Sequence, residues 1–150
     1  MWSWGAGECG QLGSGRCTNR EIATCCYRVD GSSKSSQEAF LGHDPVTTIA
    51  CGYAHVIALT KSGELYTWGI NKQGQLGLKD DVTRQAPTLM PENTFKHAIH
   101  NCQTKYPADA DGIIVSNAAD QYRIVRVFAD LHSTAAVDAV GRLYTWGTVK

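Results

Sequence analysis

Hydrophobic residues along the chain form short runs bounded by glycine, and the clearest runs lie within residues 46–69. Three runs, at 46–50, 55–60 and 64–68, are each about five residues long, and Gly-containing turns separate them. This pattern predicts antiparallel strands joined as hairpins. The middle run is apolar at every position from 56 to 59, so both of its faces need cover. We therefore expect a sheet that is sandwiched between neighbours.

The pattern is repeated along the chain. The segment GELYTWG at 63–69 recurs as GRLYTWG at 141–147, an offset of 78, with the equivalent residues Gly63 and Gly141, Trp68 and Trp146, and Gly69 and Gly147. A second motif, Gly74-Gln75-Leu76-Gly77, recurs 64 positions earlier as Gly10-Gln11-Leu12-Gly13, after Trp4-Gly5. We place the repeat cores at about 2–15, 46–90 and 124–147, with long loops at 16–45 and 91–123.

Sheets of three or four short antiparallel strands, each recurring as one unit and buried on both faces, predict an all-β fold. We expect a single, incomplete β-propeller over residues 1–150, with blades joined by Gly-rich turns. A stacked β-solenoid is the alternative, and the hairpin turns favour the propeller. His132 lies nine residues before Gly141, whereas His55 lies eight before Gly63, which predicts one extra residue or a bulge in the later strand.

The segment ACGYAHVIALTKSGELYTWGINKQGQLGL at 50–78 resembles a repeat of the regulator of chromosome condensation family. That family's pattern runs Cys-Gly-x-x-His, Ala-Leu-Thr, Gly-x-Leu-Tyr, Trp-Gly and Gly-Gln-Leu-Gly, followed by Arg-x-x-Pro. It is met here by Cys51, Gly52, His55, Ala58, Leu59, Thr60, Gly63, Leu65, Tyr66, Trp68, Gly69, Gly74, Gln75, Leu76, Gly77, Arg84 and Pro87. The chain departs from the pattern at Ala129-Asp130, where the family has Cys-Gly, and after Arg20, where a proline is missing.

The motif residues have structural roles in this interpretation. A Trp at the end of a blade strand presents a large apolar surface to the next blade, and the following glycine lets the chain leave the strand. Gly74 and Gly77 allow a positive φ or a close backbone approach, Leu76 anchors the turn, and Gln75 bonds to loop backbone groups. We expect scaffold roles and no catalytic residue among them.

The resemblance implies a seven-bladed ring, of which this chain holds about two and a half repeats. We expect a piece of a longer protein that, on its own, is poorly soluble, oligomeric or partly molten, because uncovered sheet faces invite association.

Charge and cysteine content bear on the binding partners and the cellular location of the protein. Fourteen basic residues balance fourteen acidic ones, so charge does not indicate binding to nucleic acid or chromatin. No apolar run is long enough to cross a bilayer, and the N-terminus has no secretory pattern. The six cysteines include a vicinal pair, Cys25-Cys26, and follow no disulfide framework, so we expect free thiols and a cytoplasmic or nuclear location.

The sequence gives little support for a metal site or a catalytic site. His97, His100 and Cys102 lack a spaced fourth zinc ligand, and Asp109 and Asp111 lack the remaining oxygen ligands of a calcium loop. We expect no metal and no cofactor. His55 and His132 are expected to bond to backbone near the propeller shaft, and Cys51 to be a small buried residue. No phosphate-binding loop or nucleophile elbow is present in the sequence.

These features favour a non-catalytic module that binds other proteins. The resemblance implies more specific candidates: a guanine-nucleotide exchange factor for the small GTPase Ran, a chromatin-binding protein, or a regulatory propeller attached to a ubiquitin ligase or kinase. Two other classes stay open. One is an enzyme with a His/Cys centre in residues 92–111, and the other is a purely structural segment of a longer chain.

Overall fold

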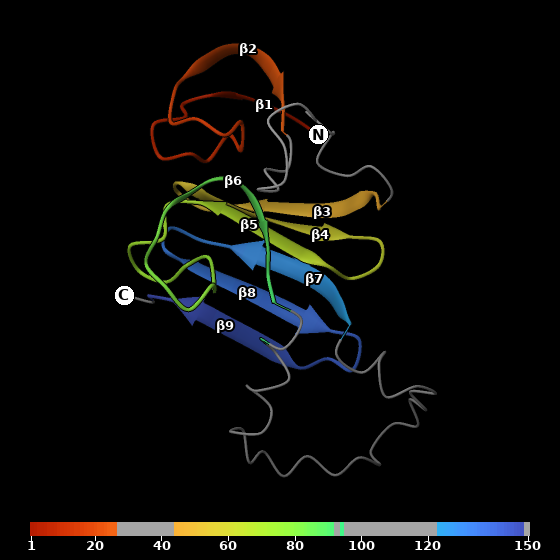
Figure 1. Ribbon diagram of the computed structural model, residues 1–150. Helices are drawn as coiled ribbons and strands as arrows, with labels where there is room; N and C mark the ends of the chain where they lie inside the picture. The colour runs from red at the N-terminus through yellow and green to blue at the C-terminus, as the bar shows by residue number, and fades with distance from the viewer. Residues whose placement is uncertain (27–43, 92–93, 95–122, 149–150) are drawn as a thin grey trace.

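The computed structural model describes residues 1–26, 44–91, 94 and 123–148. These residues form three antiparallel sheets that lie one after another in chain order (Figure 1). We call the sheets blades 1, 2 and 3. Blade 1 contains β1 (Trp2–Gly5) and β2 (Arg20–Cys25). Blade 2 contains β3 (Val46–Cys51), β4 (His55–Thr60), β5 (Leu65–Gly69) and β6 (Arg84–Leu89), and blade 3 contains β7 (Ile124–Ala129), β8 (Ser133–Asp138) and β9 (Leu143–Gly147).

Blade 1 repeats the second half of blade 2 without a gap. Gly5 pairs with Arg20 as Gly69 pairs with Arg84, and both pairs of strands shift register at the same place. One correction follows, because β2 lies inside the stretch 16–45 that the sequence predicts to be a loop. Three of its six residues are exposed and none is fully buried, and they show no hydrophobic alternation, so the sequence pattern does not reveal this strand.

Blade 3 repeats the first three strands of blade 2, also without a gap. His55 pairs with Gly69 and Ser133 pairs with Gly147, and both ladders then continue in register. The predicted extra residue or bulge in β8 is therefore wrong. Ser133 takes the position of His55, and His132 lies in the turn before β8.

The two faces of a blade carry different side chains. We define the Trp face of blade 2 by Val56, Ala58, Tyr66 and Trp68, and its Leu face by Ile57, Leu59, Leu65 and Met90. The Trp face of blade 2 packs with Met1 of blade 1. The Leu face of blade 2 packs against the Trp face of blade 3, which contains Val127, Ala136, Tyr144 and Trp146.

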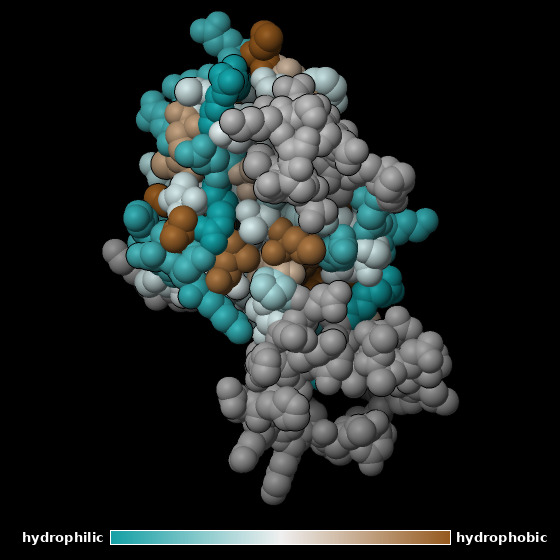
Figure 2. All heavy atoms as spheres, in the orientation of Figure 1, coloured by the Kyte–Doolittle hydropathy of each residue, from teal (hydrophilic) through white to brown (hydrophobic). Residues whose placement is uncertain are grey.

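The expected sandwich is thus confirmed for blade 2, whose strands β4 and β5 are buried along their whole length. The Leu faces of blades 1 and 2 are each covered by the Trp face of the blade that follows in the chain. Hydrophilic residues cover much of the described surface, and the hydrophobic residues on this side gather near the junction of blades 2 and 3 (Figure 2).

Candidate functional site

The two internal junctions are held by the same hydrogen bond. Trp68 Nε1 donates to the carbonyl of Gln11 at 2.8 Å, and Trp146 Nε1 donates to the carbonyl of Gln75 at 2.9 Å. The indole of one blade therefore binds the Gly-Gln-Leu-Gly turn of the blade before it. Trp68 is only 2% exposed, whereas Trp4, which has no described blade on its face, is 64% exposed.

The Gly-Gln-Leu-Gly turn is shaped to receive that indole. A Cβ added to Gly13 or Gly77 would lie 2.9 Å from Nε1 of Trp68 or Trp146, respectively. Gly77 has a φ of 69°, a conformation that residues with a Cβ resist. Most motif glycines share a positive φ: Gly5, Gly10, Gly13, Gly63, Gly69, Gly74, Gly77, Gly141 and Gly147, but not Gly52.

The other two residues of the motif fix the turn itself. The side-chain oxygens of Gln11 and Gln75 accept hydrogen bonds from the backbone amides of Cys9 and Gln73, at 3.0 and 2.9 Å. Leu12 and Leu76 are buried. Their carbonyls accept hydrogen bonds from the side chains of Ser3 and Thr67. These contacts hold the turn in its conformation.

His55 adds a second bond across the junction of blades 2 and 3. It is buried, and its Nε2 lies 2.9 Å from Thr134 Oγ1, which donates to the carbonyl of Gln75 at 2.7 Å. Because the Thr134 hydroxyl has one proton and gives it to Gln75, His55 Nε2 must carry its own proton and donate. The partner is thus a side chain of the next blade, where the sequence predicts a backbone group.

The other ring nitrogen of His55, Nδ1, has no hydrogen-bond partner in the described residues. Burial holds the pKa of His55 below its usual value, the nearby backbone of Ser133 opposes this shift, and nearby His132 adds to it. A neutral His55 is therefore the form that fits the junction. Because His55 is buried and bonded to Thr134, its geometry fits a structural role. A catalytic base would have to be accessible to a substrate.

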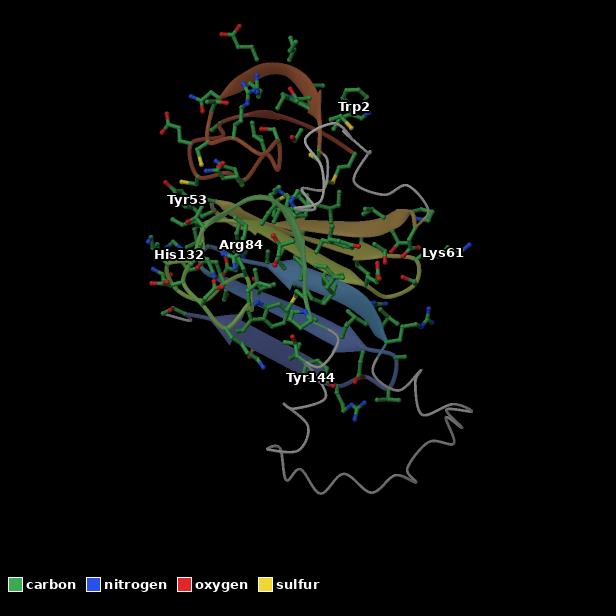
Figure 3. The ribbon with its side chains drawn as sticks, viewed as in Figure 1. Trp2, Tyr53, Lys61, Arg84, His132 and Tyr144 are labelled. Carbon is green, nitrogen blue, oxygen red and sulfur yellow. The ribbon has the colours of Figure 1, made fainter. Side chains whose placement is uncertain are left out.

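Exposed apolar side chains gather at one end of the blades. Tyr53, in the turn between β3 and β4, is 73% exposed, and Leu131, at the equivalent position of blade 3, is 61% exposed. The Tyr53 amide donates to the Leu131 carbonyl at 3.4 Å, and the Tyr53 ring lies edge-on to His132 with centroids 6.1 Å apart. Tyr53 and His132 lie together at this end, opposite Lys61 (Figure 3). We call Tyr53, Leu131 and His132 the end patch.

The loop between β5 and β6 emerges at the same end as the end patch and is tied down by polar contacts. Asn71 Nδ2 donates to the Asp80 carbonyl at 2.7 Å, and Arg84 bonds the Asp80 carboxylate at 2.6 Å. The Val82 amide and then Arg84 hold the pKa of Asp80 below its usual value. A negative carboxylate at this position therefore fixes the loop beside the patch.

The predicted metal candidates cannot be placed, because His97, His100, Cys102, Asp109 and Asp111 lie outside the described residues. Within the described ranges, no three His, Cys, Asp or Glu side chains converge on a possible ion site. The expectation of a buried Cys51 is wrong, since Cys51 is exposed on β3. The buried cysteine is Cys26, whose pKa burial raises. Cys9, Cys17, Cys25, Cys26 and Cys51 are all free.

The repeat motif alone does not identify Thr134, which lies at the junction, or Tyr53 and Leu131, which lie in the end patch. The offset of 78 could have found them, because it aligns Thr134 with Val56 and Leu131 with Tyr53. The misplaced His132 obscured this alignment.

In the part of the chain that the structure describes, no helix is long and apolar enough to span a membrane.

Comparison with known proteins decides the family. The sequence profile of the regulator of chromosome condensation (RCC1) repeat matches residues 1–59 and 62–102, and a second RCC1 repeat profile matches residues 46–75. The chain belongs to the RCC1 repeat family. It is 29% identical to the ultraviolet-B receptor UVR8 of Arabidopsis thaliana, over 97% of this chain and 36% of the relative.

A second relative is the human E3 ubiquitin-protein ligase HERC2, with 37% identity over 60% of this chain and 2% of the ligase. Among solved structures, the chain is similar to Prp20p of Saccharomyces cerevisiae, with a TM-score of 0.53 and 23% identity, over 99% of this chain and 26% of Prp20p. These neighbours are RCC1 β-propellers, so the predicted fold class is confirmed. The RCC1 repeat chain described here spans about a third or less of each of these relatives.

Proposed function

We propose that this chain is a non-catalytic propeller module that binds other proteins through the end patch. The observation that carries the proposal is the pair Tyr53 and Leu131, two large side chains at equivalent positions of adjacent blades. Exposed aromatic and aliphatic side chains at fixed loop positions are typical of protein-docking surfaces. The hydrogen bonds of the junction hold the two turns in a fixed relation, which limits the entropy that binding must overcome.

A small GTPase is the partner class that we put first. The published description of Prp20p concerns its binding to Gsp1p and to histones, and this chain shares the fold of Prp20p. The charge balance of the chain favours the GTPase over histones or nucleic acid. Nucleotide exchange, or regulation of a ubiquitin ligase as in a HERC2-like context, are second candidates. A cytoplasmic or nuclear location is part of the same proposal.

Site-specific photo-crosslinking in cells tests the docking surface. A photoreactive amino acid at Tyr53 should capture a defined partner protein, and Leu131→Glu in the same chain should abolish that adduct. The control places the photoreactive group at Lys61, which lies at the opposite end of the blades (Figure 3). Equal capture at both positions, or capture that survives Leu131→Glu, would show that the end patch is not the docking surface.

Purified components test the GTPase candidate separately. Titration of the chain into nucleotide-free Gsp1p should give binding that Tyr53→Ala weakens at least about tenfold, the loss of a central interface residue. GDP release should not accelerate, because the proposal gives this chain a binding role alone. Unchanged binding by Tyr53→Ala would show that the GTPase does not bind at the end patch. Crosslinking of Tyr53 to another protein would still support the end patch as a docking surface.

A further inference from the structure

The loop at 6–19, between β1 and β2, follows the same backbone course as the loop at 70–83, between β5 and β6. In each loop, two successive turns are closed by amide-to-carbonyl hydrogen bonds of 3.0 Å. Gly15 and Lys79, which are 64 positions apart, both have a positive φ, 74° and 62°. Residues 64 positions apart therefore occupy equivalent places in the two loops, and the loops differ in their side chains.

In the loop of blade 2, hydrogen-bond donors surround one carboxylate. The Val82 amide donates to Asp80 Oδ1 at 3.0 Å, and the Arg84 guanidinium donates to Asp80 Oδ2 at 2.6 Å. Asn71 Nδ2 donates to Asp80 Oδ1 at 3.0 Å. A backbone amide and a guanidinium that converge in this way form a site for an oxyanion, which the chain fills here with its own carboxylate.

Blade 1 keeps two of these donors and lacks the carboxylate. Counting back 64 positions, the amide donor becomes that of Thr18, the guanidinium donor becomes that of Arg20, and Arg16 replaces the carboxylate. Gly7 stands in place of the side-chain amide donor. Arg16 is exposed, and Nε of the partly buried Arg20 has no hydrogen-bond partner among the described residues. Neither arginine forms an ion pair with an acidic side chain in that part of the chain.

Other contacts than those of the two arginines hold the loop of blade 1 in place. Asn19 Oδ1 accepts a hydrogen bond from the Gly7 amide at 2.8 Å. The Gly15 amide donates to the Gln85 carbonyl of blade 2 at 2.9 Å, so the loop is fixed against the neighbouring blade. The backbone therefore positions both guanidiniums, and changes to either side chain leave these contacts intact.

We propose that Arg16, Arg20 and the Thr18 amide bind a phosphoserine or phosphothreonine side chain of a partner protein. A phosphate monoester carries close to two negative charges at neutral pH, which match the two guanidiniums, and its oxygens accept hydrogen bonds from all three donors. The bound phosphate takes the role that the Asp80 carboxylate has in blade 2. This site does not depend on the end patch or on the protein that binds there.

The surroundings favour a single phosphate on a protein over a polyanion. Glu8 is exposed in the same loop and accepts a hydrogen bond from Asn19 Nδ2 at 3.4 Å. Glu21, also exposed, directly follows Arg20. These carboxylates repel the neighbouring phosphates of a nucleic acid strand or an anionic membrane surface. Basic and acidic residues are balanced at 14 each, so no wider positive field compensates.

Fluorescence anisotropy with a labelled glycine-rich peptide that carries one phosphoserine tests the site in the full chain. The peptide should bind saturably, and its unphosphorylated form should not bind. Arg16→Asp introduces the carboxylate that blade 2 has, so it should fill the site from within and weaken binding at least about tenfold. Lys72→Asp makes the same change of charge at an exposed residue of the other loop and should leave binding unchanged.

Two further variants keep the test decisive. Arg20→Gln should also weaken binding at least about tenfold, with circular dichroism as the check on folding. Asp80→Arg gives blade 2 the same pair of arginines and should raise the number of bound peptides per chain from about one to about two. Absence of binding would overturn the proposal, as would binding that survives Arg16→Asp or that falls equally in Lys72→Asp.

Three competitors identify the source of the phosphate. Inorganic phosphate, a short single-stranded oligonucleotide and vesicles containing a phosphatidylinositol phosphate are each titrated against the bound peptide. Each should displace the labelled peptide only at a higher phosphate concentration than the unlabelled phosphopeptide requires. Displacement at a lower concentration would assign the site to a free anion, a nucleic acid or a membrane and would overturn the assignment to a phosphorylated protein. Tyr53→Ala, which tests the end patch, should leave peptide binding unchanged.

Discussion

Trp4, Trp68 and Trp146 occupy the same position of the repeat in three different environments. Trp68→Ala removes a buried indole and its hydrogen bond to Gln11, so we expect the free energy of unfolding to fall by about 3–5 kcal/mol. Trp4→Ala changes an exposed side chain and should cost less than about 0.5 kcal/mol. Urea unfolding of both variants, at a concentration where the chain is monomeric, measures the difference. Similar losses in the two variants would contradict the assignment of Trp68 as the anchor of the junction.

Gly74 and Gly77 separate backbone strain from crowding within one turn. Both have a positive φ, 74° and 69°, so alanine at either position costs about 1–2 kcal/mol of strain. A Cβ at Gly74 would meet nothing, whereas one at Gly77 would lie 2.8 Å from Met90 Cε and 2.9 Å from Trp146 Nε1.

We therefore expect Gly77→Ala to destabilise the chain more than Gly74→Ala, and to weaken the junction with blade 3 selectively. Thermal unfolding ranks the two variants, and amide hydrogen exchange of β8 and β9 reports the junction with blade 3. If the two variants behave alike, strain alone decides and the close approach of the indole is not important.

At the scale of elements, the contact of β4 with β8 through His55 makes the junction sensitive to pH. The pKa of His55 is lowered from 6.5 in the folded chain, so on acidification the unfolded chain binds the proton first. The stabilising contribution of His55 is thus complete above about pH 6.5 and is lost as the pH falls towards the folded pKa. Urea unfolding from about pH 8 to pH 5 should show this decline.

Two variants isolate the histidine from other titrating groups. His55→Gln keeps a donor near Thr134 but does not titrate, so it should flatten the decline between about pH 6.5 and pH 5. His132→Gln should preserve most of it. Thr134→Val leaves His55 Nε2 and the Gln75 carbonyl with fewer partners, and should cost about 1–3 kcal/mol at neutral pH. An unchanged pH profile in His55→Gln would show that His55 is not the responsible group.

Several strands could be predicted because the local sequence determines where they begin and end. The runs at 46–50, 55–60 and 64–68 correspond to β3, β4 and β5, and Gly-containing turns separate them. β2 was missed because its exposed residues give no hydrophobic period. Thr134 and the end patch were missed because their roles depend on the neighbouring blade, which no local pattern reports. The exposure of Cys51 likewise depends on what lies against the face of β3.

At the scale of the whole molecule, the three blades differ in how much of their surface is covered. Blade 2 has a neighbour on both faces, whereas blades 1 and 3 each have one neighbour in the described structure. Local stability follows the number of buried apolar contacts, so an end blade opens more easily than the blade between two others. Within residues 1–26, blade 1 has two paired strands, and β1 is largely exposed.

We therefore expect amide hydrogen exchange to be slowest in β4 and β5, intermediate in β8, and fastest in β1 and β2. Mass spectrometry of peptic fragments measures this order. Equal protection of blades 1 and 2 would mean that the chain unfolds as a single cooperative unit, with its end blades as stable as its centre.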